Sequence, residues 1–256
     1  MSTTPWDYIA KLVCIGDSGC GKSSLTIRLC EGRFSPHHDV TIGVEFGSRI
    51  VPVGPPHSKA SNTRPSSSSD PSNPDAPDGL PEPPRDAPLV PQKHMKLSLW
   101  DTAGQETYKS VTRSYFRGAS GALLVFDLSR KHTFQHVTDW LNDLRQIAEP
   151  DIVVILVGNK ADLTQQENNK REVTREEAEE WASRNGVMEY VETSAKSGEN
   201  VEKAFMRVAE RIYQNIQAGK YDLNDRRSGV KGPAAGGNRQ VRLAGDSSKS
   251  ATGGCC

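Results

Sequence analysis

Eight residues near the start of the chain have the types and spacing of a phosphate-binding loop. Glycines let such a loop wrap tightly, so that backbone N–H groups and the N-terminus of the next helix face phosphate oxygens. We expect Lys22 to contact the β- and γ-phosphates, Ser23 to ligate Mg²⁺, and Ser24 to lie in the same site. The segment that matches G-x-x-x-x-G-K-[ST] is Gly16, Asp17, Ser18, Gly19, Cys20, Gly21, Lys22 and Ser23.

A second segment has the side chains that hydrolysis of a γ-phosphate requires. Asp101 follows an apolar run, and an Asp at the end of a strand holds Mg²⁺ in phosphate-loop enzymes, directly or through water. Gly104 can place its N–H against a γ-phosphate, and Gln105 can orient the attacking water. A lone D-x-x-G would be weak evidence, but its place after a phosphate loop and before a Gln makes hydrolysis the prediction.

Two later segments have the chemistry of guanine recognition. The Asp162 carboxylate can accept hydrogen bonds from N1–H and from the exocyclic amine of guanine, a pair of donors that adenine lacks. Two such bonds favour guanine by about 3–6 kcal/mol. Either segment alone could be an ordinary strand-to-helix turn, but together and in this order they predict guanine. The further expected contacts are Lys160 over the base, Asn159 to the phosphate loop, and a backbone N–H for guanine O6 from the segment Ser194, Ala195 and Lys196.

These segments lie at the ends of apolar runs that alternate with helical patterns. This alternation predicts an α/β fold, a single phosphate-loop domain with a six-stranded, mostly parallel sheet and helices on both faces. A capping box at Thr174 opens the third helix. The expected strands are 11–15, 45–51, 95–100, 122–127, 152–158 and 188–193, and the expected helices are 22–31, 133–148, 174–185 and 201–217.

Two stretches depart from this pattern. Residues 54–94 contain 11 of the 16 prolines and a run of four serines, a composition that cannot bury enough apolar surface to order itself. We interpret them as a disordered insertion between two paired strands, either inert, or a proline-rich docking segment, or an error in the gene model. Residues 219–256 form a flexible tail with a net charge of +4, the domain spans 8–218, and residues 1–7 precede it.

The overall composition excludes several classes of protein. Thirty-two basic and 32 acidic residues cancel, so nothing supports a nucleic-acid partner. The sequence contains no apolar run long enough to span a membrane and no secretory signal. The five cysteines match neither a zinc site nor a disulfide framework, which favours a reducing cytosol.

Together these motifs resemble a small GTPase of the Ras superfamily, specifically the Rab family. The segment 41–47, Thr-Ile-Gly-Val-Glu-Phe-Gly, is similar to the Rab effector-switch segment. The resemblance implies that Thr41 completes the Mg²⁺ shell with Ser23 and Asp101, and that Phe34 packs against guanine. It also implies an effector surface, with plain core packing as the alternative for its three aromatic residues. That surface would contain Ile42, Phe46, Trp100 and Tyr115.

The resemblance further implies what the chain does and where. We expect a vesicle-trafficking switch with a slow GTPase reaction, GTP/GDP and Mg²⁺ as ligands, and Gln105, Lys22 and Thr41 as catalytic residues. Cys255 and Cys256 would carry prenyl groups, whereas the bare pair could equally be two exposed thiols. The implied partners are an exchange factor, an activating protein, effectors, a prenylation escort and a GDP-dissociation inhibitor. The implied state is a monomer on the cytosolic face of Golgi or endosomal membranes, cycling with the cytosol.

Some residues depart from the family pattern, and two other functions remain in view. Rab proteins usually continue the Gln motif with Glu-Arg-Phe, but this chain has Glu106-Thr107-Tyr108, which affects partner choice. One alternative function is a nucleotide-bound scaffold with negligible hydrolysis. The other is a nucleoside kinase, which would require an arginine-rich lid that the sequence does not show.

Overall fold

The computed structural model describes residues 5–37, 39–57, 91–165, 169–225 and 228–232. Its centre is a sheet in the order β2-β3-β1-β4-β5-β6, with a short seventh strand, β7, paired to β1. All neighbours along the path are parallel except β2 and β3, which form an antiparallel pair. The strands are β1 (Tyr8–Ile15), β2 (Val44–Val53), β3 (Lys93–Thr102), β4 (Gly121–Asp127), β5 (Val153–Asn159), β6 (Tyr190–Glu192) and β7 (Val230–Lys231). The mostly parallel α/β sheet predicted from the sequence is therefore confirmed.

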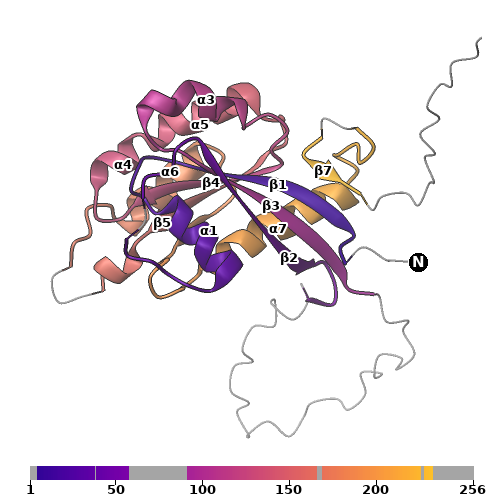
Figure 1. Ribbon diagram of the computed structural model, residues 1–256, viewed down its shortest axis with the longest axis horizontal. Helices are drawn as coiled ribbons and strands as arrows, with labels where there is room; N and C mark the ends of the chain where they lie inside the picture. The colour runs from indigo at the N-terminus through magenta and orange to yellow at the C-terminus, as the bar shows by residue number, and fades with distance from the viewer. Residues whose placement is uncertain (1–4, 38, 58–90, 166–168, 226–227, 233–256) are drawn as a thin grey trace, which may run out of the picture.

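Helices cover both faces of this sheet (Figure 1). Helices α1 and α7 lie on one face, and α3, α4, α5 and α6 lie on the other. Two short 3-10 turns, η1 (Glu106–Tyr108) and η2 (Ala161–Leu163), follow β3 and β5. The helices are α1 (Lys22–Glu31), α3 (Lys109–Ser114), α4 (Lys131–Gln135), α5 (Val137–Ile147), α6 (Arg175–Arg184) and α7 (Val201–Gln217).

The apolar run of strand β4 is unbroken because the strand is buried on both of its faces. Side chains alternate along a strand, so Leu123 and Val125 enter the core beneath α1 and α7. Leu124 and Phe126 enter the core beneath α4, α5 and α6. A strand with helices on both faces must be apolar at every position, and this burial holds the carboxyl ends of the strands at one edge of the sheet.

Two of the expected helices show how local sequence sets their bounds. The Thr174 hydroxyl accepts a hydrogen bond of 3.2 Å from the Glu177 amide, which caps the start of α6 as the capping box predicts. The helix expected over 133–148 is instead two helices. Helix α4 ends at Gln135, and α5 begins at Val137 after His136. The single-helix prediction was wrong at that junction.

The ends of the predicted insertion lie close together. The Gln92 side chain donates to the Val53 carbonyl at 2.9 Å and accepts from the His57 amide at 3.1 Å. The Gly54 amide donates to the Glu210 carboxylate of α7 at 3.0 Å. Residues 58–90, the bulk of the predicted insertion, lie outside the described part of the chain.

Part of the predicted tail packs on the sheet. Val230 of β7 is fully buried and pairs with Ala10, beside the part of β1 that precedes its pairing with β4. Tyr221 and Leu223 pack against the same core. Packed structure therefore continues to residue 232, beyond the expected domain end at 218, and the sheet has seven strands instead of six. Cys255 and Cys256 lie outside the described residues.

Candidate nucleotide-binding site

The phosphate loop connects β1 to α1 through a tight turn. The φ angles of Gly16, Gly19 and Gly21 are 137°, 74° and 90°, values that favour glycine. A Cβ on Gly21 would lie 2.4 Å from the Asn159 side-chain nitrogen, so a larger residue would collide there. The Lys22 ammonium donates to the carbonyls of Gly16 and Asp17, each at 2.9 Å, and is thereby held across the loop.

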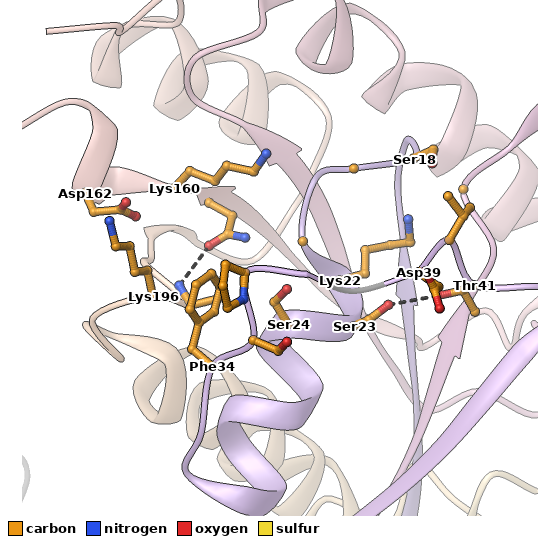
Figure 2. Close-up of a pocket in the computed structure, with 18 of the residues that line it drawn as sticks. Ser18, Lys22, Ser23, Ser24, Phe34, Asp39, Thr41, Lys160, Asp162 and Lys196 are labelled. Carbon is orange, nitrogen blue, oxygen red and sulfur yellow. Dashed lines mark hydrogen bonds between the residues drawn. The ribbon is translucent and has the colours of Figure 1, made fainter. Parts of the chain in front are cut away.

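A cleft of about 490 Å³ opens along this loop (Figure 2). Its walls are the phosphate loop and the start of α1, the segment 34–41, and the segments that follow β3, β5 and β6. These segments are far apart in the sequence and meet because parallel strands end at the same edge of the sheet. The predicted site residues that line the cleft are Ser18, Gly19, Gly21, Lys22, Ser23, Ser24, Phe34, Thr41, Gly104, Asn159, Lys160, Asp162, Ala195 and Lys196.

One end of the cleft is built from the segments that follow β5 and β6. The Asn159 carboxamide donates to the Cys20 carbonyl at 2.8 Å and accepts from the Ala195 amide at 3.2 Å. It therefore joins the phosphate loop to both segments. The Asp162 carboxylate accepts from the Ser194 hydroxyl at 2.6 Å, and this fixes its direction. Asp162, Lys196 and Phe34 lie around the same end of the cleft (Figure 2).

The other end brings three oxygen-bearing side chains together. The hydroxyls of Ser23 and Thr41 lie 2.9 Å apart, and the Ser23 hydroxyl donates to the Asp101 carboxylate in a very short hydrogen bond. The Thr41 hydroxyl also lies 3.4 Å from that carboxylate. The three residues come from α1, the segment before β2 and the end of β3. Figure 2 shows Ser23 and Thr41 pointing toward each other.

The geometry at Gly104 links this end to the phosphate loop. The Ser18 amide donates to the Gly104 carbonyl at 3.0 Å. A Cβ on Gly104 would lie 2.5 Å from the Lys22 amine and from the Ser18 amide nitrogen, so only glycine fits. The segment after β3 can therefore approach the loop closely enough to respond to what the loop holds.

A comparison with protein families identifies this arrangement. The family model described as the Ras family matches residues 11–61 and 85–214, which is more than half of the chain. The chain belongs to the Ras family. Proteins of this family bind guanine nucleotide and Mg²⁺, hydrolyse GTP and interact with exchange factors, activating proteins and effectors. The two matched ranges contain every segment of the cleft and leave out residues 62–84, which lie within the proline-rich stretch.

The residues at the second end of the cleft suit the Mg²⁺ of a Ras-family protein. Two hydroxyls and one carboxylate lie within hydrogen-bond distance of one another, and Mg²⁺ prefers oxygen ligands. Among the described residues, no group of three or more His, Cys, Asp or Glu is placed so that it could hold a metal ion. A set of two hydroxyls and one carboxylate is expected instead where substrate phosphates supply further oxygens.

Six residues predicted for the nucleotide and Mg²⁺ site do not line the cleft. Three of them contact residues that do line it: the carbonyls of Gly16 and Cys20 accept from Lys22 and Asn159, and the Ser194 hydroxyl donates to Asp162. Asp101 lines the neighbouring cleft between α1 and β2. Gln105 is half-buried directly after Gly104, one residue before η1 begins. The sixth residue is Asp17.

Asp17 points away from the phosphate loop's concave side. Its carboxylate accepts from Trp140 Nε1 at 2.8 Å and lies 2.7 Å from His136 Nδ1, both at the start of α5. A carboxylate facing phosphate would be repelled, so these partners make an acidic residue compatible with an anion-binding loop. The prediction that Asp17 binds nucleotide therefore holds at most for its backbone.

Five lining residues were not predicted from the sequence. Four of them lie between Phe34 and Thr41, two residues that were predicted to line the site, so their position in the sequence could have identified them. The fifth lies in η2, directly after Asp162. They are Ser35, Pro36, Asp39, Val40 and Leu163.

The aromatic residues of the predicted effector surface form a cluster on β2, β3 and the segment after α3. The Phe46 and Trp100 ring centroids lie 4.6 Å apart at 80°, and those of Trp100 and Tyr115 lie 5.6 Å apart. Phe46 is 66% exposed and nearby Ile42 is 78% exposed. Plain core packing does not describe Phe46, whereas Trp100 and Tyr115 are half-buried and Trp100 packs against the core on the α4, α5 and α6 side of the sheet.

Proposed function

We propose that this Ras-family GTPase is a Rab-type switch that regulates vesicle trafficking at an internal membrane. The observation that carries the proposal is the aromatic cluster of Phe46, Trp100 and Tyr115, in which Phe46 is exposed beside the exposed Ile42, next to the segment that contains Thr41. An exposed apolar patch of this kind marks a protein-binding surface. Its position next to a residue of the nucleotide site makes partner binding dependent on the bound nucleotide.

The reaction is attack of water on the γ-phosphate of GTP. Lys22 and the backbone N–H groups of the phosphate loop stabilise the charge that develops on phosphate oxygens. Gln105 orients the attacking water, for which its position next to Gly104 is suitable. Mg²⁺, when bound by Ser23, Thr41 and Asp101, supplies further positive charge to the phosphates.

Unaided hydrolysis is proposed to be slow. None of the described residues that line the cleft is an arginine, so none can reach the transferred phosphate from within it. In Ras, an arginine supplied by an activating protein accelerates the reaction by about 10⁵-fold. A partner of this protein can supply the same group.

Loss of the γ-phosphate is the switching event. Thr41 and Gly104 both line the cleft, and each belongs to a segment that leads to the aromatic cluster. When the phosphate leaves, both segments are released and an effector loses its surface. The proposed partners are effectors, an exchange factor, an activating protein, a prenylation escort and a GDP-dissociation inhibitor.

Membrane attachment is proposed to use Cys255 and Cys256. Two prenyl chains give stable anchoring, whereas one lipid chain gives only marginal binding. The described residues contain no helix both long and apolar enough to cross a membrane. The proposed location is the cytosolic face of Golgi or endosomal membranes.

Replacing both terminal cysteines with serine tests this membrane proposal. In cells, we expect the unaltered chain in the membrane fraction and the Cys255→Ser/Cys256→Ser variant in the cytosolic fraction. Cys30→Ser is the matched control, because Cys30 is a half-buried thiol within the domain and its loss should leave the distribution unchanged. Membrane recovery of the double variant equal to that of the unaltered chain would contradict the proposal.

A further inference from the structure

The Asp127 carboxylate at the end of β4 lies between two cations. It is 1% exposed, accepts from Arg130 Nε at 2.9 Å and pairs with the Lys160 amine at 2.7 Å. The amide and hydroxyl of Ser129 donate to its other oxygen. Burial raises the pKa of Asp127, but the hydrogen bonds from Lys160 and Ser129 outweigh burial and hold the pKa below its ordinary value. A buried, ionised carboxylate therefore connects Arg130 to Lys160.

Arg130 continues this connection to the outer side of the phosphate loop. Its Nη2 donates to the Ser18 carbonyl at 3.3 Å. A Cβ on Gly19 would lie 3.2 Å from the same nitrogen, which shows how closely the guanidinium approaches the loop. The planar guanidinium can contact Asp127 and the loop at once because its donors point in fixed, divergent directions.

Lys160 carries the connection to the guanine end of the cleft. Its backbone is in the left-handed conformation, with φ of 68°, and its side chain lines the cleft. In Figure 2 that side chain extends away from Asp162, toward the side of the cleft on which Ser18 lies. Asp127 holds its amine there, so the orientation of Lys160 depends on the carboxylate that Arg130 also holds.

We propose that Arg130 is a positioning residue that, through Asp127, joins the phosphate loop to the guanine-binding segment and so slows nucleotide release. The inference rests on the proposed nucleotide site. Release requires the two segments to separate from the nucleotide, and a charge-assisted link between them opposes that separation. Asn159 makes a direct link to Cys20, and Arg130 makes a second link at Ser18.

The test measures release of a fluorescent GDP analogue from the Mg²⁺-loaded full chain. Arg130→Ala should speed release about tenfold, the change expected for one lost charge-assisted hydrogen bond. Arg130→Lys should restore release only in part, because an ammonium lacks the fork that spans both partners. The matched control is Lys131→Ala, since Lys131 pairs with Glu177 instead of contacting the loop.

The rate of GTP hydrolysis distinguishes a specific effect of Arg130 on nucleotide release from a general disruption of the site. Arg130 does not line the cleft, so single-turnover hydrolysis of bound GTP by Arg130→Ala should stay within about twofold of the unaltered chain. In a double-mutant cycle with Lys160→Ala, the effects on release should be less than additive, because both residues act through Asp127.

Four results would overturn the inference. They are unchanged release in Arg130→Ala, equal acceleration in Lys131→Ala, a parallel loss of hydrolysis, and full additivity with Lys160→Ala. Failure of the unaltered chain to retain any guanine nucleotide would instead overturn the proposed function, and the inference with it. The unaltered chain therefore distinguishes the two failures.

Discussion

At the scale of single residues, the site depends on side chains that hold other groups in place. Asn159 contacts Cys20 and Ala195 because β5 and β6 are parallel neighbours that end beside the phosphate loop. Asp17 is turned outward by Trp140 and His136. Such residues fix the shape of the cleft before any ligand contributes.

The pair of Arg171 and Glu192 supports β6, just before the segment that contains Ala195. Two hydrogen bonds of 2.9 and 2.8 Å join the guanidinium to the carboxylate. Burial raises the pKa of Glu192, but the bonds from Arg171 and Tyr190 outweigh burial and hold it below its ordinary value of 4.5. The stability that Glu192 contributes is therefore present above that value and lost as pH falls through the lower folded pKa.

We expect Glu192→Gln to lower the free energy of unfolding at pH 7 by about 1.5–3 kcal/mol. The deficit should shrink as pH falls below the ordinary value, because the unaltered protein then loses the same charge. Urea titrations at several pH values measure this. Glu179→Gln is the control, since its pair with Arg175 is exposed and contributes little. A deficit that does not change with pH would contradict the account.

The sequence motifs predicted which residues lie at the site better than they predicted where the side chains point. Lys22, Ser23 and Asp162 follow from motifs, because backbone geometry fixes where those side chains can point. Asp17 belongs to the same motif, yet its direction is set by α5, which lies more than a hundred residues away in the sequence. The contact of Arg130 with Ser18 has the same long-range origin and could not be predicted.

At the scale of elements, β7 shows how a few residues can extend a sheet. The Lys11 amide donates to the Gly229 carbonyl at 2.9 Å, and Val230 fills the core beside Ala10. A Cβ on Gly229 would lie 1.7 Å from the Gly118 carbonyl oxygen, so only glycine permits this approach.

Gly229→Ala should therefore release β7 from the sheet. We expect the Lys11 amide to exchange its hydrogen faster, because its acceptor is lost, while amides of β4 stay protected. Hydrogen exchange followed by NMR resolves the two. Gly232→Ala is the matched control, since its Cβ would meet only the Leu223 side chain, at 3.3 Å. Unchanged protection of Lys11 in Gly229→Ala would show that β7 does not depend on this approach.

Elements with strong periodicity were predicted closely, and short ones were not. Helices α1 and α7 begin and end where the sequence predicted. Helix α7 buries an apolar stripe against the sheet, and α1 lies between two glycines, Gly21 and Gly32, in the left-handed conformation. Strand β7 has two residues and helix α3 has six, too few to show a period. The glycine-rich, charged surroundings of Val230 favoured a flexible tail, and long-range burial overrides that local preference.

At the scale of the whole molecule, the predicted insertion begins far from the reaction. The start of β3 pairs with the start of β1, whereas the phosphate loop follows the end of β1. Gln92 and Glu210 hold the two ends of the insertion at the far end of the sheet.

Replacing residues 58–90 with a short Gly-Ser linker should leave the site intact. Closing a long loop costs little more than closing a short one, so GDP release and GTP hydrolysis should change by less than about twofold. Release of a fluorescent GDP analogue and single-turnover hydrolysis check this. A change of ten times or more in either rate would mean that the segment takes part in the nucleotide cycle.

The most direct test of the account is the nucleotide content and turnover of the purified protein. Bound nucleotide is extracted and identified, and hydrolysis of loaded GTP is then followed with and without Mg²⁺. We predict guanine nucleotide and slow, Mg²⁺-dependent formation of GDP, with still slower turnover in Gln105→Leu. Guanine nucleotide without GDP formation would favour a scaffold, and an empty or adenine-filled cleft would contradict the central claim.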